Sequence, residues 1–346
     1  MIVPYKDNWE ETEARMRAWW ERKIIKRIPM AIHVGKGKKV NLPKATDAET
    51  LYCDGDFLKR ELKIRFDNSY FVAETIPNYS FMFGYAFPGV FMGQTPVMDM
   101  KTVWFKHSEE LLESMPLDFN TENKLWRKLM KLESELLEVS MQGLPVFIQP
   151  MDVISMILGA EKTCFELIER PELIKSCRDR LTVTFKKMYE EAYSLTAKKY
   201  DGSTCWLPVW SPGKYFPLQC DFSCMISEDM FEEFVVPELE DLTNFLDNSI
   251  YHLDGVNALH HLPRLLKFKK INAIQWVPGA GKPEGMYWKE VFKQILESGK
   301  GVYASIPAGE VEEAVKTLPR EGLWIDTSVG TLEEANELIK IAEKYN

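Results

Sequence analysis

The sequence Ile-Tyr-His-Leu-Asp-Gly at positions 250–255 decides the fold prediction for this chain. An apolar, β-prone run at 249–253 ends in His-x-Asp-Gly and passes into a helical pattern from Val256. The pattern predicts a strand that presents the His252 imidazole and the Asp254 carboxylate on one face. Ligands of parallel α/β proteins bind at the C-terminal ends of strands, so this pair is a candidate for proton transfer or metal binding. The structural alternative is a histidine at a strand end and an aspartate that caps the next helix.

Similar runs recur along the chain and alternate with helical patterns. Several of them are continuously apolar, as expected for strands covered on both faces. Eight alternating strand–helix units favour an α/β fold of the (β/α)8 TIM-barrel type over an open doubly wound sheet. The expected strands are 29–34, 69–75, 146–150, 204–210, 249–254, 273–277, 302–306 and 323–327.

Two segments fall outside this repeat. An amphipathic helix is expected at 9–26, before the first strand. An insertion rich in Phe, Tyr, Met, Gly and Pro follows the second strand at 78–107, with a possible extra strand at 102–107. Long insertions of this kind are often lids or binding loops, and Tyr79 is a candidate substrate contact within it. No linker or low-complexity tract interrupts the pattern, so we expect a single domain over residues 1–346.

The composition limits the class of protein. The chain has 346 residues, 45% of them hydrophobic, which is enough for a large core. Its net charge is −9 and it has no long Lys/Arg run, so nucleic-acid binding is not expected. No apolar run reaches the roughly 20 residues of a membrane span, and no signal peptide is visible. These features predict a cytoplasmic protein with no membrane association.

Cysteine spacing and known motifs add little chemistry. The six cysteines are scattered and predict reduced thiols, and the CxxxC pair Cys220 and Cys224 is more typical of small buried residues than of a metal site. The sequence contains no GxGxxG after the first strand, no P-loop, no HExxH and no GxSxG. It also lacks the Asp-x-His-x-x-Gly sequence of a corrinoid-carrying module.

If the barrel prediction holds, polar and aromatic residues at the strand ends face one pocket. Carboxylates close to one another and shielded from water have raised pKa values, which suits general acid catalysis. The alternative for about half of the set is a capping or core role. The residues expected to converge are His33, Glu74, Asp152, Trp206, Trp210, Gln219, Asp221, His252, Asp254, Trp276, Ser305, Asp326 and Thr327.

The region 218–281 resembles the uroporphyrinogen decarboxylase superfamily. The similarity is carried by Leu-Gln-Cys-Asp-Phe-Ser at 218–223, by Met-Ile-Ser-Glu-Asp-Met-Phe at 225–231, by 234–237, by 251–255 and by Gln-Trp at 275–276. Further matches lie at 152–159, 169–172 and 27–29. The resemblance implies a (β/α)8 barrel, in agreement with the strand count.

The superfamily implies two chemistries. One is cofactor-free decarboxylation of tetrapyrrole acetate side chains, which belongs to porphyrin metabolism. The other is methyl transfer that involves a corrinoid and a thiol, with zinc bound by His-x-Cys and a later Cys. The decarboxylases carry an arginine-rich loop after the first strand, whereas this chain has lysines at 36–39 and no arginine there, and lysine is a poorer partner for carboxylates.

The zinc motif is also altered. His252 matches its histidine, but Asp254 replaces the first cysteine, and the later cysteine position falls near Thr327 or Ser328. Zinc therefore lacks the thiolate ligands of the family motif, and a His252–Asp254 pair predicts a harder, weaker metal site or none.

The resemblance therefore implies a divergent methyltransferase-like enzyme that moves a methyl group between a small methylated substrate and a corrinoid on a partner protein. The expected catalytic residues are His252, Asp254, Asp221 and Glu74, and the expected substrate contacts are Asp152, Trp206, Trp210, Gln219, Trp276 and Tyr79. The partner would dock near residues 78–95, and the exposed aromatic insertion makes a homodimer plausible. A decarboxylase and a non-catalytic tetrapyrrole- or corrinoid-binding barrel are the alternatives.

Overall fold

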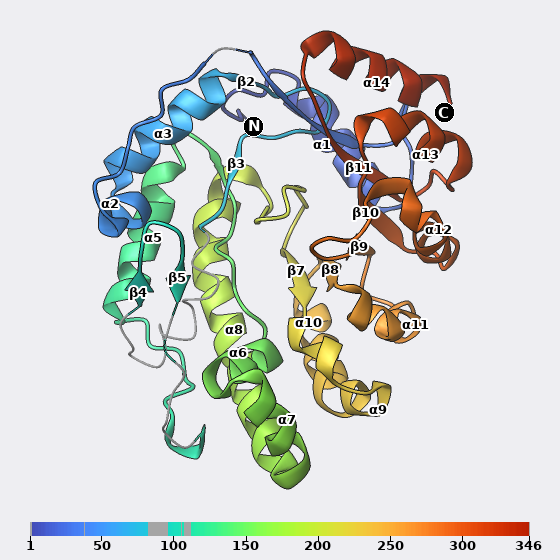
Figure 1. Ribbon diagram of the computed structural model, residues 1–346. Coiled ribbons are helices and arrows are strands. Elements are labelled where there is room, and N and C mark those ends of the chain that lie inside the picture. Colours follow the sequence, from blue (N-terminus) through green and yellow to red (C-terminus); the bar gives the residue numbers. More distant parts are fainter. Residues whose placement is uncertain (1, 38, 82–95, 105, 107–111, 346) are drawn as a thin grey trace.

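A seven-stranded sheet forms the centre of the computed structural model (Figure 1), which describes all residues except 1, 38, 82–95, 105, 107–111 and 346. The strand order is β2-β1-β11-β10-β9-β8-β7, and all neighbours are parallel except β2, which runs antiparallel to β1. The strands are β1 Met30–Gly35, β2 Ser69–Tyr70, β7 Tyr215–Gln219, β8 Asn248–Asp254, β9 Ala273–Val277, β10 Gly301–Ser305 and β11 Leu323–Val329.

Two short strand pairs lie outside this sheet. β3 (Asn78–Tyr79) pairs in parallel with β6 (Met141–Gln142), and β4 (Val97–Met98) pairs antiparallel with β5 (Val103–Trp104). The sheet hydrogen bonds of the described residues do not join β7 to β2, so a closed barrel is not confirmed. The predicted α/β class with a parallel central sheet is confirmed.

Helices surround the strands (Figure 1). Within the described part of the chain, the longest helix, α8, begins at Pro171, whose missing N–H costs nothing at the first helical position. No helix in this part is long and apolar enough to span a membrane. The helices are α1 Trp9–Trp20, α2 Ala48–Cys53, α3 Gly55–Asp67, α5 Lys124–Leu136, α6 Pro150–Leu158, α7 Ala160–Glu169, α8 Pro171–Tyr200, α9 Glu228–Met230, α10 Val236–Phe245, α11 Leu262–Leu265, α12 Lys289–Glu297, α13 Val311–Thr317 and α14 Leu332–Lys344.

The expected N-terminal helix is present but ends at Trp20, six residues early. Trp19 packs edge-on against Trp324, with ring centroids 5.3 Å apart, and its indole N–H donates to the carbonyl of Gly322, next to the start of β11. Trp20 packs against Tyr215, the first residue of β7. Helix α1 therefore covers the N-terminal ends of these strands and leaves their C-terminal ends for a site.

Three strand predictions are wrong in position or extent. The run 204–210 is irregular, because Pro208, Pro212 and a left-handed Gly213 (φ 73°) turn the chain, and the strand is β7, which follows. β7 contains Pro217, which the sheet tolerates because β7 is an edge strand. The run 69–75 is a strand only over β2.

The third misplaced run, 146–150, contains no strand. The Val146 N–H donates to the carbonyl of Phe81, and helix α6 already begins at Pro150. The other five predicted strands are confirmed with small shifts at their ends. Most of the 78–107 insertion, including the expected lid, lies outside the described residues.

Candidate active site

The C-terminal ends of β7 and β8 bring the first site residues together. Gln219 is the register partner of His252 across the β7–β8 ladder, and His252 is in turn the partner of Gln275 on β9. His252 and Asp254 are two residues apart on one strand, so their side chains leave the same face, as the sequence predicts. Parallel pairing thus places three polar residues in one row.

Asp221 reaches the same place from the 3-10 turn Asp221–Met225, directly after β7. The buried Asp152 side chain on α6 holds this turn by accepting hydrogen bonds from the backbone N–H groups of Asp221 and Phe222, each 3.0 Å long. Gln219 donates to the Asp221 carboxylate at 3.1 Å. Asp152 and Gln219 therefore fix where Asp221 lies.

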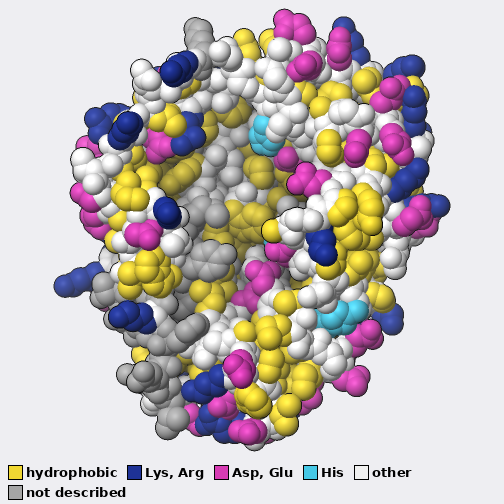
Figure 2. All heavy atoms as spheres, in the orientation of Figure 1, with side chains coloured by type: hydrophobic (Ala, Val, Ile, Leu, Met, Phe, Trp, Pro, Cys, Tyr) yellow, Lys and Arg dark blue, Asp and Glu magenta, His cyan; other side chains and the backbone are white. Residues whose placement is uncertain are grey.

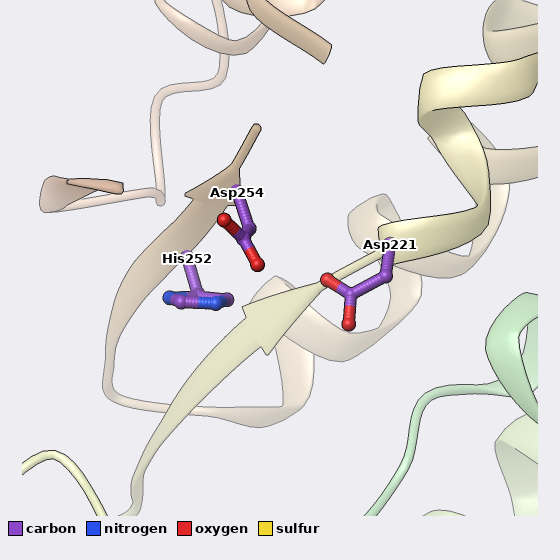
Figure 3. A group of neighbouring side chains, drawn as sticks. All are labelled: Asp221, His252 and Asp254. Carbon is purple, nitrogen blue, oxygen red and sulfur yellow. The ribbon is translucent and has the colours of Figure 1, made fainter. Parts of the chain in front are cut away.

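Asp221, His252 and Asp254 form a compact group of three potential ligands. One ligand atom from each lies within 4.8 Å of the others. Figure 3 shows the two carboxylates pointing toward each other, with the His252 ring beside Asp254. Asp254 Oδ1 is buried and has no hydrogen-bond partner within the described part of the chain. An unsatisfied buried oxygen in such a group is suited to accept a proton or a cation.

Gln275 fixes the tautomer of His252. The imidazole Nδ1 lies 2.6 Å from the side-chain Oε1 of Gln275. An amide oxygen only accepts hydrogen bonds, so Nδ1 carries the proton and Nε2 keeps its lone pair. The edge of one ring also meets the face of the other where His252 contacts Trp206, with centroids 5.1 Å apart and planes at 90°. The imidazole is thus held in place, and its Nε2 has no hydrogen-bond partner among the described residues.

The protein environment shifts the pKa values of Asp221 and His252 in opposite directions. Surrounding protein reduces the hydration of Asp221 and raises its pKa to about 7, and the charges of Asp152 and Asp254 act in the same direction. Burial lowers the pKa of His252, against the opposing effects of Gln275 and Asp254. Near neutral pH the site therefore contains a neutral imidazole and a carboxyl group poised between its two states.

These residues line a cavity of about 370 Å³. Figure 2 shows this face of the molecule hollowed at its centre, with acidic side chains inside the hollow. No Lys or Arg occurs among the described residues that line the cavity, although three Asp do. The lining residues are Val146, Ile148, Asp152, Ser155, Met156, Trp206, Gln219, Asp221, Phe222, His252 and Asp254.

Glu74, an expected catalytic residue, does not line this cavity. It is fully buried and accepts hydrogen bonds from Arg15 at 2.5 Å, from Arg27 at 2.7 and 3.0 Å, and from the Met30 N–H at 2.7 Å. Glu74 is thus the centre of a buried ion-pair network that links α1 to β1. Ala73, next to it in the chain, has a positive φ of 48°, and the preceding strand β2 already ends at Tyr70.

Three expected aromatic contacts also lie elsewhere. Trp210 is buried in the core, where its indole N–H donates to the Tyr200 carbonyl and its ring packs on Trp9. Trp276 is buried against Trp288, and Tyr79 lines a separate cavity of about 410 Å³. Of the four expected aromatic contacts, Trp206 is the one that lines the candidate site.

The sequence analysis missed Gln275, Ser155, Met156 and Phe222. Gln275 could have been found, because the ladder that makes it the neighbour of His252 also turns Trp276 to the other face. Cys220 is buried and Cys224 is exposed, and neither belongs to the three-residue group.

A solved structure, a methyltransferase from Methanosarcina mazei, has a similar fold. The TM-score is 0.61 at 9% sequence identity, and the match covers 96% of this chain and 98% of that chain. At this identity the likeness shows the fold alone, and it agrees with the predicted α/β class. No protein-family model and no curated protein sequence matches the chain.

Proposed function

We propose that this protein is a methyltransferase-like enzyme that moves a methyl group between a small methylated substrate and a corrinoid carried by a partner protein. The observation that supports it most is the group Asp221–His252–Asp254, gathered within 4.8 Å in an acidic cavity. The fold likeness to a methyltransferase is consistent with this proposal. We also propose that the fold is a (β/α)8 barrel, which closes partly through contacts other than sheet hydrogen bonds.

The three-residue group suits a divalent cation. It offers one imidazole nitrogen and two carboxylate oxygens, a harder donor set than the thiolates of the family motif. The unsatisfied Asp254 Oδ1 and the preset His252 tautomer both suit ligation, and Gln275 acts as the outer partner that metal-bound histidines commonly have. A bound zinc or similar ion would act as a Lewis acid on the leaving atom of the substrate.

The residues themselves can manage the proton. Removal of a methyl group from an amine or a phenol ether leaves a basic atom that needs a proton. With its pKa raised to about 7, Asp221 can hold a proton near neutral pH and deliver it to that atom. Asp152 and Gln219 hold Asp221 in place for this step.

The polarity of the cavity defines the substrate class. Three carboxylates and no described Lys or Arg side chain line it, so a carboxylate substrate would be repelled. This argues against the decarboxylase alternative and favours a neutral or cationic methyl donor. Trp206 offers an aromatic surface, which attracts methylated ammonium groups.

The size of the cavity fits a small substrate. Its volume of about 370 Å³ is near the lower end for small-molecule sites. A corrinoid is much larger than such substrates, so it would remain on its partner and present its reactive face at the cavity mouth. The residues proposed to dock that partner, 78–95, lie mostly outside the described part of the chain.

An activity assay tests the proposal. Purified protein is mixed with added cob(I)alamin and with methylated amines or methoxylated aromatics, and formation of methylcobalamin is followed by absorbance. We expect turnover that falls by about a hundredfold or more in His252→Ala and Asp254→Asn, the usual scale for loss of an acid–base or metal-ligand residue. His260→Gln is the matched control, because His260 contacts the Ile226 carbonyl instead of this cavity. Turnover that survives in His252→Ala and Asp254→Asn contradicts the proposal.

A further inference from the structure

A second polar group lies on strands nearer the β2 edge of the sheet, away from the β7 edge. It joins three adjacent strands: His33 on β1, Asp326 on β11 and Tyr303 on β10. The Asp326 Oδ2 atom accepts a hydrogen bond from the Tyr303 hydroxyl at 2.5 Å and lies 3.1 Å from the His33 Nε2 atom. Tyr303 is buried, whereas 46% of the His33 side chain is exposed. The group therefore runs from the core to an open imidazole.

The contacts determine which nitrogen of His33 is free. A carboxylate accepts hydrogen bonds, so Nε2 carries the proton that it donates to Asp326. Nδ1 has no hydrogen-bond partner in the described parts of the chain, and its lone pair is available as a base. The hydrogen bond that His33 donates to Asp326 raises the pKa of His33, and burial opposes this effect. A histidine oriented by a carboxylate in this way is the arrangement that enzymes use for general base catalysis.

His33 opens into a separate cavity of about 690 Å³. Its charged lining residues, His33, Lys36 and Arg65, are all basic, and no Asp or Glu is among the described residues that line it. Lys36 donates to the Asp67 carbonyl and Arg65 pairs with Glu61, so part of this charge is already balanced. Trp206 lines both this cavity and the acidic one. The two cavities thus meet at one side chain and have opposite polarity.

A purely structural role would explain Asp326 as the acceptor that satisfies the buried Tyr303 hydroxyl. It would not explain why the same carboxylate atom also holds a half-open histidine at the wall of a large cavity. It also leaves the apolar surface beside His33 without a role. This apolar surface includes Val34, Leu42, Phe66, Phe71, Ile76 and Trp206.

We infer that the 690 Å³ cavity is a second ligand site, and that His33, positioned by Asp326 and Tyr303, takes a proton there from the hydroxyl or thiol of a partly apolar small molecule. The O–H or S–H bond breaks, its electron pair stays on oxygen or sulfur, and a new N–H bond forms at His33 Nδ1. Asp326 balances the imidazolium, while Lys36 and Arg65 attract the anion. His33 is the catalytic residue and Asp326 and Tyr303 are positioning residues. Apart from Trp206, which lines both cavities, the inference uses none of the residues that carry the proposed methyl transfer.

Two chromogenic probes test it: 4-nitrophenol for a hydroxyl and 4-nitrothiophenol for a thiol. Each is titrated into the full-length protein over a range of pH, and the band of the anion is compared with that of the free probe at the same pH. We expect the band of the bound anion with at least one probe. His33→Gln should bind that probe at least about tenfold more weakly than the parent protein, the loss expected for one charge-assisted hydrogen bond. His260→Gln should bind like the parent protein.

The positioning residues have their own readout. Asp326→Asn should move the pH midpoint of probe ionisation, because His33 becomes a weaker base, and Asp326→Glu should restore part of the change. Nitrogen NMR of the labelled imidazole should show the Nε2–H tautomer in the parent and lose that preference in Asp326→Asn. An unchanged band in His33→Gln overturns the inference, as does the absence of a band with both probes. Metal binding and methyl transfer should be unchanged in His33→Gln. These two measurements separate failure of this inference from failure of the proposed function.

Discussion

The Nδ1 atom of His252 lies 2.6 Å from the side-chain oxygen of Gln275, its register partner on the next strand. This contact leaves Nε2 unprotonated toward a cavity that also contains Asp221 and Asp254. Gln275, which is not one of the three potential ligands, thus decides whether the imidazole can act as a ligand. The tautomer of His252 therefore depends on the parallel pairing of β8 with β9 and not only on the three side chains of the site.

Replacement of Gln275 by Leu should weaken metal binding without removing a ligand. The His252 ring loses the acceptor that fixes its tautomer and orientation, and loss of such a partner commonly lowers metal affinity by about 10–100-fold. Calorimetric titration with Zn²⁺ measures the change. Gln294→Leu, on the exposed face of α12, is the matched control and should bind as the parent does. Equal affinity in all three proteins would show that Gln275 does not prepare His252.

The ionisation of Asp221 should make the metal-free protein less stable as the pH rises. Its pKa is about 7 in the folded state against an ordinary value of 3.8. Between these values the folded protein retains a proton that the unfolded chain has lost, so the free energy of unfolding falls with increasing pH. Asp221→Asn removes this ionisation and should flatten that part of the profile. Denaturant unfolding across the window tests this, and parallel profiles for the two proteins would contradict it.

Glu74 should matter for stability and not for ligand binding. Glu74→Gln leaves the buried Arg15 and Arg27 without their carboxylate, and breaking a buried pair of this kind costs about 3–5 kcal/mol. Glu11→Gln removes an exposed partner of the same Arg15 and should cost no more than about 1 kcal/mol. Urea unfolding measures both. Loss of Zn²⁺ binding in Glu74→Gln with unchanged unfolding would instead restore Glu74 to the active site.

Trp206 should contribute to binding of a cationic methyl donor. The cation–π attraction of an aromatic face is worth about 0.5–2 kcal/mol, so Trp206→Ala should weaken binding of tetramethylammonium to the metal-free protein by roughly 2–30-fold. Trp206→Phe should keep most of the affinity. Trp104→Ala, on β5, is the control, and calorimetry is the measurement. An affinity unaffected by Trp206→Ala would mean that this ring does not contact the ligand.

The sequence predicts the part of the site that one strand carries. His252 and Asp254 follow from strand alternation, and β8 itself is confirmed. Asp221 was expected after a strand at 204–210, but in the structure it follows β7 after one residue. The prolines at 208, 212 and 217 make the sequence in and before β7 resemble irregular chain. The same error in strand position explains why Trp210, a core residue, was grouped with Trp206.

Other features depend on contacts between distant segments and have no local signal. Nothing near Glu74 in the sequence indicates that Arg15 and Arg27 will neutralise it. The pKa of Asp221 depends first on its burial and then on the charge of Asp152, about seventy residues away, whose place is set by α6. The homodimer, the cytoplasmic location and the corrinoid-carrying partner remain predictions.

The most direct test of the central claim is a crystal structure of the protein soaked with Zn²⁺, with anomalous data that locate the ion. The account predicts one ion bound by Nε2 of His252 and by carboxylate oxygens of Asp221 and Asp254, at about 2.0–2.2 Å. An ion bound elsewhere, or ordered side chains of these three residues with no ion between them, would contradict it.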